Sequence, residues 1–266
     1  MKVLHNKYVT VILAAVAVAC GFSSCGTPIP MQEMVPAKIA VPRNARVHIS
    51  TSGPGAYAMQ QAAQQVIGSD EFFSIVYGNA DLGIRIDTDR TVEHRSYTDK
   101  KGRTSHYTVE NSYADISLLN YHNQSVITST GRLHVGSNFS DGNCRDAVQE
   151  FYDLIHPRIV DYTERVSIDK SDNPNLYIAA QLCQAGKWEE AYVKVQESIA
   201  AVPNDPEAYF LKAMIEREDS KFDESDATLQ QAMQIEAKSK YSKALQKNAV
   251  LRVTQEQAIE QMNNAL

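Results

Sequence analysis

A 34-residue period near the C-terminus limits the fold of this chain more than any other feature of its sequence. Trp188 and Phe222 lie 34 residues apart, and Val195 and Leu229 repeat the same offset. A period of this length is typical of a helix pair that cannot bury its apolar side alone and therefore stacks on its neighbours. From residue 173 onward we expect helical hairpins and no strands.

The residue types within this period resemble the tetratricopeptide repeat. The string Ala-Gly-Lys-Trp-Glu-Glu-Ala over 185–191 is similar to the turn and second helix of that repeat. Small residues let the two helices of a hairpin approach closely, and the aromatic residue fills the gap between them. The matching core positions are Ala179, Leu182, Gly186, Trp188, Ala191 and Pro203 in a first repeat over 173–205, and Tyr209, Ala213, Phe222 and Ala232 in a second repeat over 206–239.

The resemblance to this repeat family implies a concave surface suited to peptides or protein segments. The second repeat departs from the family pattern, because Ser220 replaces the turn glycine and Ser225 replaces an inner alanine. The residues after Lys240 do not match a third repeat. We expect one or two capping helices there, so that the helical domain spans 173–266.

The preceding part of the chain mixes strand and helix patterns. Met59, Ala62, Ala63, Val66 and Ile67 form a stripe with helical spacing that ends at Gly68. Strand patterns surround this helix, and a second helix is expected after Ser140. The predicted strands are Ala45–Ser50, Phe72–Tyr77, Ala80–Ile86, Tyr107–Leu119 and Ser125–Val135. The predicted fold class is therefore α+β: an N-terminal α/β domain over 44–166 with an antiparallel meander, then an all-α domain of helical hairpins.

A polar hairpin centred on Lys100 is the best candidate for binding chemistry in the α/β domain. That centre would place His94 opposite His106, although no third metal ligand is evident and two exposed histidines explain the pattern as well. The hairpin is also locally basic, which suits either a solvated ribbon or contact with anionic lipid or glycan. The basic residues are Arg90, Arg95, Lys100, Lys101 and Arg103. We predict no metal site and no cofactor.

The N-terminus is typical of a secretion signal. Two lysines precede an apolar run, Val9–Ala19, which is too short to span a bilayer. The Ser-Ser-Cys-Gly string ending at Gly26 resembles lipoprotein signals of the Bacteroidota. We therefore predict a signal peptide over 1–24 and lipidation of Cys25, with Cys20 as the alternative. Four prolines over 26–42 indicate an extended, lipid-anchored stalk over 25–43.

Composition and motifs argue against several functions. The chain has 26 basic and 32 acidic residues, a net charge of -6, which argues against nucleic acid as the main partner. It contains no nucleophile elbow, zinc-protease motif or phosphate-binding loop. We therefore predict a protein that is not an enzyme.

Together these parts resemble envelope lipoproteins of the Bacteroidota, in which a domain akin to the curli-secretion lipoprotein and TolB amino-terminal folds precedes tetratricopeptide repeats. The residues that carry this resemblance are Val35–Ile39, Ala45–Ser50 and Ile155–Val160. It implies a lipid anchor in the cell envelope. Residues 26–30 lack the acidic cluster that resembles the Bacteroidota surface-export signal, so we expect the periplasmic face of the outer membrane. The predicted function is a scaffold or adaptor that binds a protein partner through its repeats. The alternative is a subunit of an envelope secretion or export channel, although the hairpin is polar on both faces.

Overall fold

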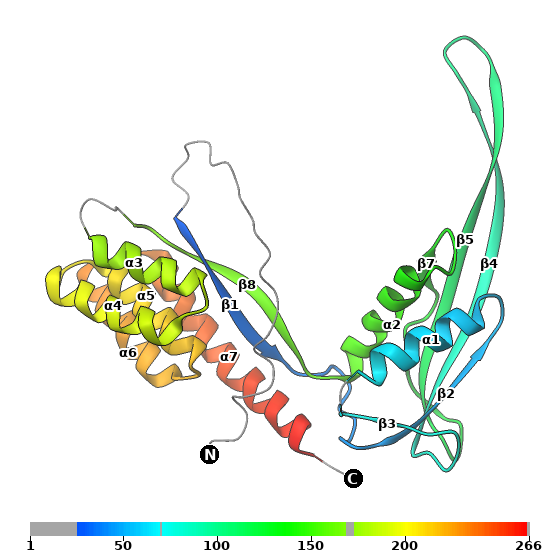
Figure 1. The fold of residues 1–266 in the computed structure, drawn as a ribbon, viewed down its shortest axis with the longest axis horizontal. Coiled ribbons are helices and arrows are strands. Elements are labelled where there is room, and N and C mark those ends of the chain that lie inside the picture. The colour runs from blue at the N-terminus through cyan, green and yellow to red at the C-terminus, as the bar shows by residue number, and fades with distance from the viewer. Residues whose placement is uncertain (1–25, 70, 169–172, 265–266) are drawn as a thin grey trace.

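The protein mixes helices and sheets in two bodies, each with its own hydrophobic core (Figure 1). The structure is a computed structural model that describes residues 26–69, 71–168 and 173–264. The predicted signal peptide and both lipidation candidates, Cys20 and Cys25, lie outside the described residues. Among the described residues, helices account for 44% and strands for 30%, so the predicted mixture of the two is confirmed.

The first body is a sheet with two helices on one face (Figure 1). Its strand order is β3-β2-β4-β5-β6, and β7 also pairs with β5. β2 is parallel to β3 and β4, whereas β4, β5, β6 and β7 are mutually antiparallel where they pair. The elements are β2 (Arg46–Ser52), α1 (Ala56–Ile67), β3 (Ser74–Ile75), β4 (Leu82–Thr98), β5 (Thr104–Asn120), β6 (Val126–Ser129), β7 (Leu133–Gly136) and α2 (Asp141–Ile155).

The helices of this body follow the sequence pattern closely. The five stripe residues predicted for the first helix are the buried residues of α1. Ser140 caps α2, since its side chain accepts a hydrogen bond from the backbone N–H of Asn143. α2 ends at Ile155, two residues before Pro157, which cannot continue a helix.

The second body contains five helices, of which four form two antiparallel hairpins. They are α3 (Pro174–Gln184) with α4 (Trp188–Ala201), and α5 (Pro206–Glu218) with α6 (Phe222–Ile235). A single long helix, α7 (Ser239–Asn263), follows them. Gly186 turns the first hairpin with φ 70°, and Ser220 turns the second with φ 60°, so the serine adopts the left-handed backbone of the glycine it replaces.

Two strands of the second body lie outside the helical domain that the sequence predicts. β1 (Thr27–Val35) lies in the predicted stalk and β8 (Arg158–Val166) in the predicted α/β domain, yet they pair with each other and pack on the helices. The boundaries 25–43 and 44–166 are therefore wrong in this respect. The physical reason is that Ile29 and Met31 point to the same face of β1, where they are 0% and 1% exposed in the core of the helical body.

The last helix connects the two bodies. Its N-terminal half packs on α6, while Met262 at its other end packs on the core of the first body. Gln261 exchanges two hydrogen bonds with the backbone of Ala37, and the N–H of Arg43 bonds to the carbonyl of Asn264. α7 therefore holds the segment that leaves β1 and enters the first body. In the described part of the chain, no helix is long and apolar enough to cross a membrane.

Candidate interaction site

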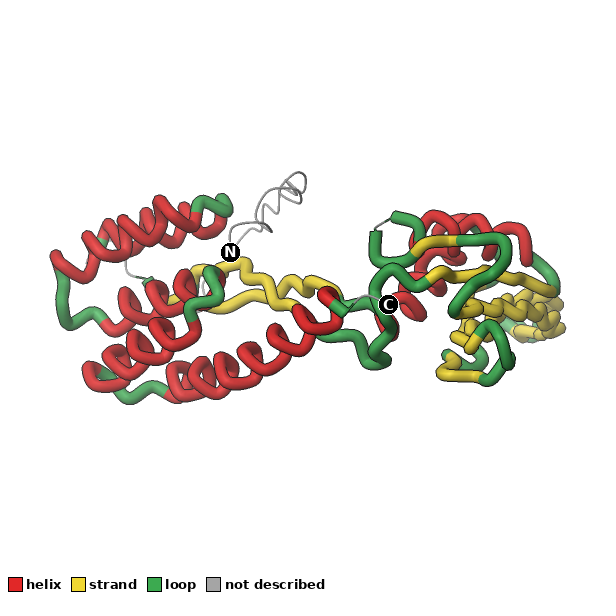
Figure 2. The backbone as a smooth tube through the Cα atoms, turned by 90° about the horizontal axis from the view of Figure 1, so that it is seen from below, coloured by secondary structure: helices red, strands yellow, loops and turns green. Residues whose placement is uncertain are grey.

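The inner face of the helical body is covered by the chain's own strands. β1 lies against α3, α5 and α7, and β8 lies against α5, so that the strands run between helices in Figure 2. The Gln184 side chain donates to the carbonyl of Pro28 at 2.9 Å, which fastens the start of β1. β1 and β8 thus occupy the side of α3 and α5 on which they lie, and a peptide partner would have to bind elsewhere on the helices or displace these strands.

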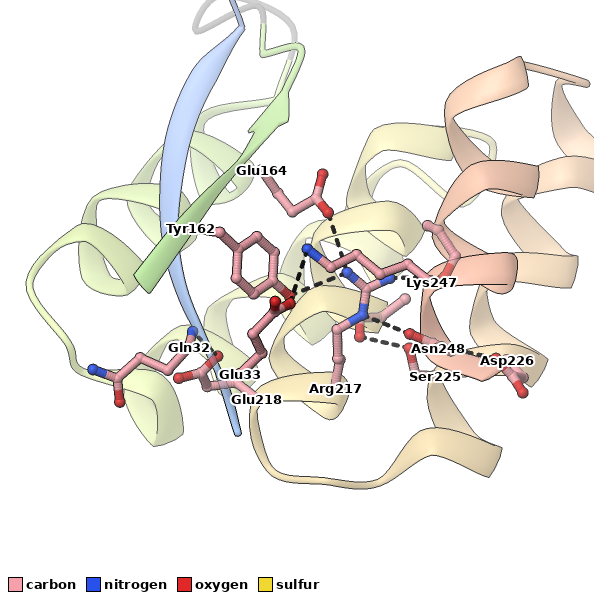
Figure 3. A network of polar contacts seen from close by, with 12 residues as sticks. Gln32, Glu33, Tyr162, Glu164, Arg217, Glu218, Ser225, Asp226, Lys247 and Asn248 are labelled. Atoms are coloured by element: carbon pink, nitrogen blue, oxygen red, sulfur yellow. Dashed lines mark hydrogen bonds and ion pairs between the residues drawn. The ribbon is translucent and has the colours of Figure 1, made fainter. Parts of the chain in front are cut away.

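A buried arginine joins this strand pair to the helices (Figure 3). The side chain of Arg217 is 2% exposed and pairs with Glu164 of β8 at 3.2 Å. Its guanidinium also donates to the Asn248 side chain and to the carbonyl of Ala244, both on α7. Asn248 in turn donates to Ser225, the serine that replaces the inner alanine of the repeat. One cation therefore links a strand, the second hairpin and the last helix.

Glu218, at the end of α5, makes a further polar contact that holds β1 against the helices. Its carboxylate accepts a hydrogen bond from the backbone N–H of Gln32 at 3.1 Å. Burial raises the pKa of Glu218 to about 7, because the charged form loses solvent, and the Gln32 bond offsets this only in part. Nearby, Lys247 pairs with Glu33 and lies over the Tyr162 ring, 3.0 Å from its centroid. Burial lowers the pKa of Lys247.

Sequence reasoning missed this network. Arg217 and Asn248 are polar residues on helices, and such residues usually face water. The only signal in the sequence was Ser225 at a position where the repeat pattern has alanine. A hydroxyl in a packed hairpin needs a partner, and here it bonds to the carbonyl of Ala213 as well as to Asn248.

The predicted repeat positions differ in how deeply they are buried. The four alanines at these positions are 0% exposed, which fits close helix approach. Trp188 packs against the core of the helical body and is partly buried. The other partly buried positions are Leu182, Tyr209 and Phe222, whereas Gly186 and Pro203 are exposed in turns.

The hairpin of β4 and β5 extends far beyond the first body, past both of its helices (Figure 1). We call residues 89–113 the arm. The part of each strand that lies beyond Asp89, about ten residues, spans roughly 30 Å. One face carries Tyr97, Arg95 and Tyr107, and the two tyrosines are 61% and 49% exposed. At its base the arm pairs with β7 through Ser112 and Tyr113, and beyond that base most side chains on both faces are exposed.

The register of the arm corrects the predicted histidine pair. His94 is opposite Thr108, and His106 is opposite Ser96, because the hairpin is centred one residue later than expected. His94 bonds to the Thr108 hydroxyl at 3.3 Å. Among the described residues, no three His, Cys, Asp or Glu side chains come together as a metal site would require.

The two described cysteines are buried thiols. Cys144 belongs to the first core and Cys183 to the second, and neither forms a disulfide. Burial raises the pKa of Cys144, and it raises the pKa of Cys183 to about 12. A thiol is nucleophilic as the thiolate, so these two groups are packing residues.

Comparisons with known proteins give little further guidance. No family model matches the chain, and no curated protein matches it. A neuraminyllactose-binding hemagglutinin homolog from Helicobacter pylori is similar at TM-score 0.29 and 10% identity, over 42% of this chain and 83% of that one. A PDZ domain protein from Parabacteroides distasonis is similar at TM-score 0.26 and 7% identity, over 53% of this chain and 39% of that one. Similarities at such low scores support no argument about fold or function.

Proposed function

We propose that this protein is a non-enzymatic scaffold of the bacterial cell envelope, lipid-anchored through Cys25, that holds a protein partner through the arm. In this proposal the two hairpins, α3–α4 and α5–α6, are tetratricopeptide repeats that serve as a rigid platform. The partner surface moves from the repeats to the arm, because β1 and β8 already cover the inner face of the helices.

The exposure of the arm is the observation that carries this proposal. A two-stranded hairpin without a core is marginally stable in water, so a long ribbon that leaves its domain contributes little to folding. Exposed tyrosines beside an arginine supply the aromatic and cationic groups that dominate protein interfaces. On the arm these are Tyr97, Tyr107 and Arg95, and Arg95 pairs with Glu93 at 2.7 Å.

The export-channel alternative has no comparable support. Side chains alternate between the two faces of the ribbon, and both faces carry charge: Arg90 and Glu110 on one, Glu93 and Arg95 on the other. A hairpin facing lipid would need one continuous apolar face.

Site-specific photo-crosslinking in intact cells tests the scaffold function. A crosslinking amino acid at Tyr97 should give one adduct of defined mass, because this side chain faces the proposed partner. The matched control is Tyr57 on α1, which is 76% exposed on the body of the first domain and should give none. Equal labelling at both sites, or no adduct at Tyr97, would contradict a partner site on the arm.

A further inference from the structure

The two outer edges of the β1–β8 ribbon differ in how well they are protected against pairing with a further strand. On the β1 edge, Pro28 and Pro30 have no N–H to leave unpaired, and the next outward N–H, that of Gln32, bonds to Glu218. Prolines and side-chain caps are the usual devices that prevent another strand from pairing with an edge. The β1 edge is therefore protected against pairing with a further strand.

Among the described residues, the β8 edge has neither a proline nor a side-chain cap on its outward N–H groups. Because the Gln32 N–H points away from β8, the odd-numbered residues of β1 face β8, and their partners in the register are the even-numbered residues of β8. The outward backbone groups of β8 are therefore those of its odd-numbered residues, Ile159, Asp161, Thr163 and Arg165. No backbone hydrogen bond from another described segment reaches their N–H groups.

This edge is also regular and accessible. Its pairing with β1 runs over nine residues without a register shift, and it contains no proline or lysine. The side chains of all four odd-numbered residues are exposed, including Ile159 at 58%. A long, regular and accessible edge is a template for a further strand.

We propose that the β8 edge pairs antiparallel with the β8 edge of a second copy of this chain, with Thr163 on the two-fold axis. The two ribbons then form one four-stranded sheet, β1-β8-β8-β1. A two-fold interface brings the same patch of both copies together, so the patch must complement itself.

Charge complementarity selects the second copy and the register. With Thr163 opposite its own copy, Asp161 lies directly opposite Arg165 of the second copy, and the same ion pair forms again on the other side of the axis. Directly opposed residues on one face have their Cβ atoms about 5 Å apart, within reach of such a pair. A register centred on Asp161 would instead oppose two carboxylates, which is unfavourable.

The side chains are free to make these contacts. Asp161 accepts one hydrogen bond from the Gln32 side chain, and Arg165 donates one to the carbonyl of Gly26. Both bonds are exposed, so exchanging them for an ion pair across the axis removes no buried contact. The new backbone bonds satisfy N–H groups that otherwise face water.

Cysteine crosslinking of the full-length protein in the native envelope tests the register. Thr163→Cys should give a disulfide-linked dimer on mild oxidation, because an opposed pair has Cα atoms about 5.5 Å apart, within disulfide range. The matched control is Ile159→Cys, on the same edge and face, which the register places opposite Ser167 of the second copy and which should remain monomeric. The buried Cys144 and Cys183 are common to both variants.

Charge exchange tests the complementarity. Asp161→Arg should weaken dimerisation of the full chain by about tenfold or more, because it places an arginine directly opposite Arg165 of the other copy on both sides of the two-fold axis. Asp161→Arg combined with Arg165→Asp should restore it, and analytical ultracentrifugation measures both. A monomeric wild type, a crosslink from Thr163→Cys to a different protein, or equal crosslinking of Ile159→Cys would overturn the proposal. None of these outcomes changes the crosslinking expected at Tyr97.

Discussion

At the scale of single residues, two turns show how far backbone conformation decides tolerance to substitution. Gly186 and Ser220 both have positive φ, at equivalent places in the two hairpins. Glycine adopts this conformation without strain, whereas a side chain brings Cβ close to the following carbonyl oxygen. The serine turn is therefore the strained member of the pair, and its hydroxyl accepts a hydrogen bond from Gln255 at 2.7 Å.

We expect Gly186→Ala to destabilise the protein by about 1 kcal/mol through backbone strain alone. A Cβ at this position meets no atom within 4 Å, so no clash contributes. Gly142→Ala is the matched control, because Gly142 also faces open space but lies in α2 without a positive φ. Chemical denaturation measures both. Equal losses for the two variants would contradict the strain argument.

Glu218 should make the stability of the protein depend on pH. Its pKa is raised to about 7 in the folded protein from 4.5 in the unfolded chain, so folding favours the protonated form. Stability should fall as pH rises from about 4.5 to 7 and stay low above that range. We expect Glu218→Gln to be more stable than wild type at pH 8, by roughly 1–2 kcal/mol after allowance for partial solvation, and equal to it at pH 4.

Urea titrations of both proteins at several pH values measure this difference. Subtracting one from the other cancels the groups that they share. A stability difference that stays constant between pH 4 and pH 8 would show that Glu218 does not titrate as its burial implies.

At the scale of elements, the helical hairpins depend on strands that are distant in the sequence. The core of the helical body includes Ile29 and Met31 of β1 and Val166 of β8. Removing these strands exposes the apolar inner face of the helices and leaves Arg217 without Glu164. Exposure of apolar side chains to water destabilises the helical body.

We therefore expect a fragment of residues 173–266 to be helical but only weakly cooperative. A longer fragment that adds residues 26–35 and 158–168 through a flexible linker should melt cooperatively and at a higher temperature. Circular dichroism melts of the two fragments measure the difference. If the shorter fragment melts as sharply and at the same temperature, the strands are not part of the folding unit.

At the scale of the whole molecule, β1 would place a membrane anchor at Cys25 beside the helical body. The first described residue, Gly26, accepts a hydrogen bond from Arg165, so the chain enters the fold directly after Cys25. The predicted stalk is therefore short, and such an anchor would hold the helical body near the membrane. The arm belongs to the other body, past α1 and α2 (Figure 1).

We expect Cys25→Ser to lose the lipid and to leave the membrane fraction, because in the proposed function Cys25 carries the acyl chains that anchor the protein. Intact-mass spectrometry of the wild type and the variant measures acylation, with Cys20→Ser as the matched control that should remain acylated. Retained acylation in Cys25→Ser would assign the anchor to Cys20 instead.

Local periodicity determined much of this protein without any structure. The five-residue stripe of α1, the Ser140 cap of α2 and the hairpins around Gly186 and Ser220 depend on neighbours in the sequence. Contacts of this kind repeat with the period of the helix, so a single sequence displays them.

Contacts between distant segments settled which surfaces are covered and which are free. β1 pairs with β8 although more than a hundred residues of chain separate them. The sequence of neither strand identifies the other as its pairing partner. Two apolar residues at alternate positions in β1 would suit a stalk, an edge strand or a strand that fills a groove. The distant helices that bury Ile29 and Met31 decide which of these structures forms. As a result β1 and β8 cover the inner face of the helices, whereas the arm and the β8 edge remain exposed.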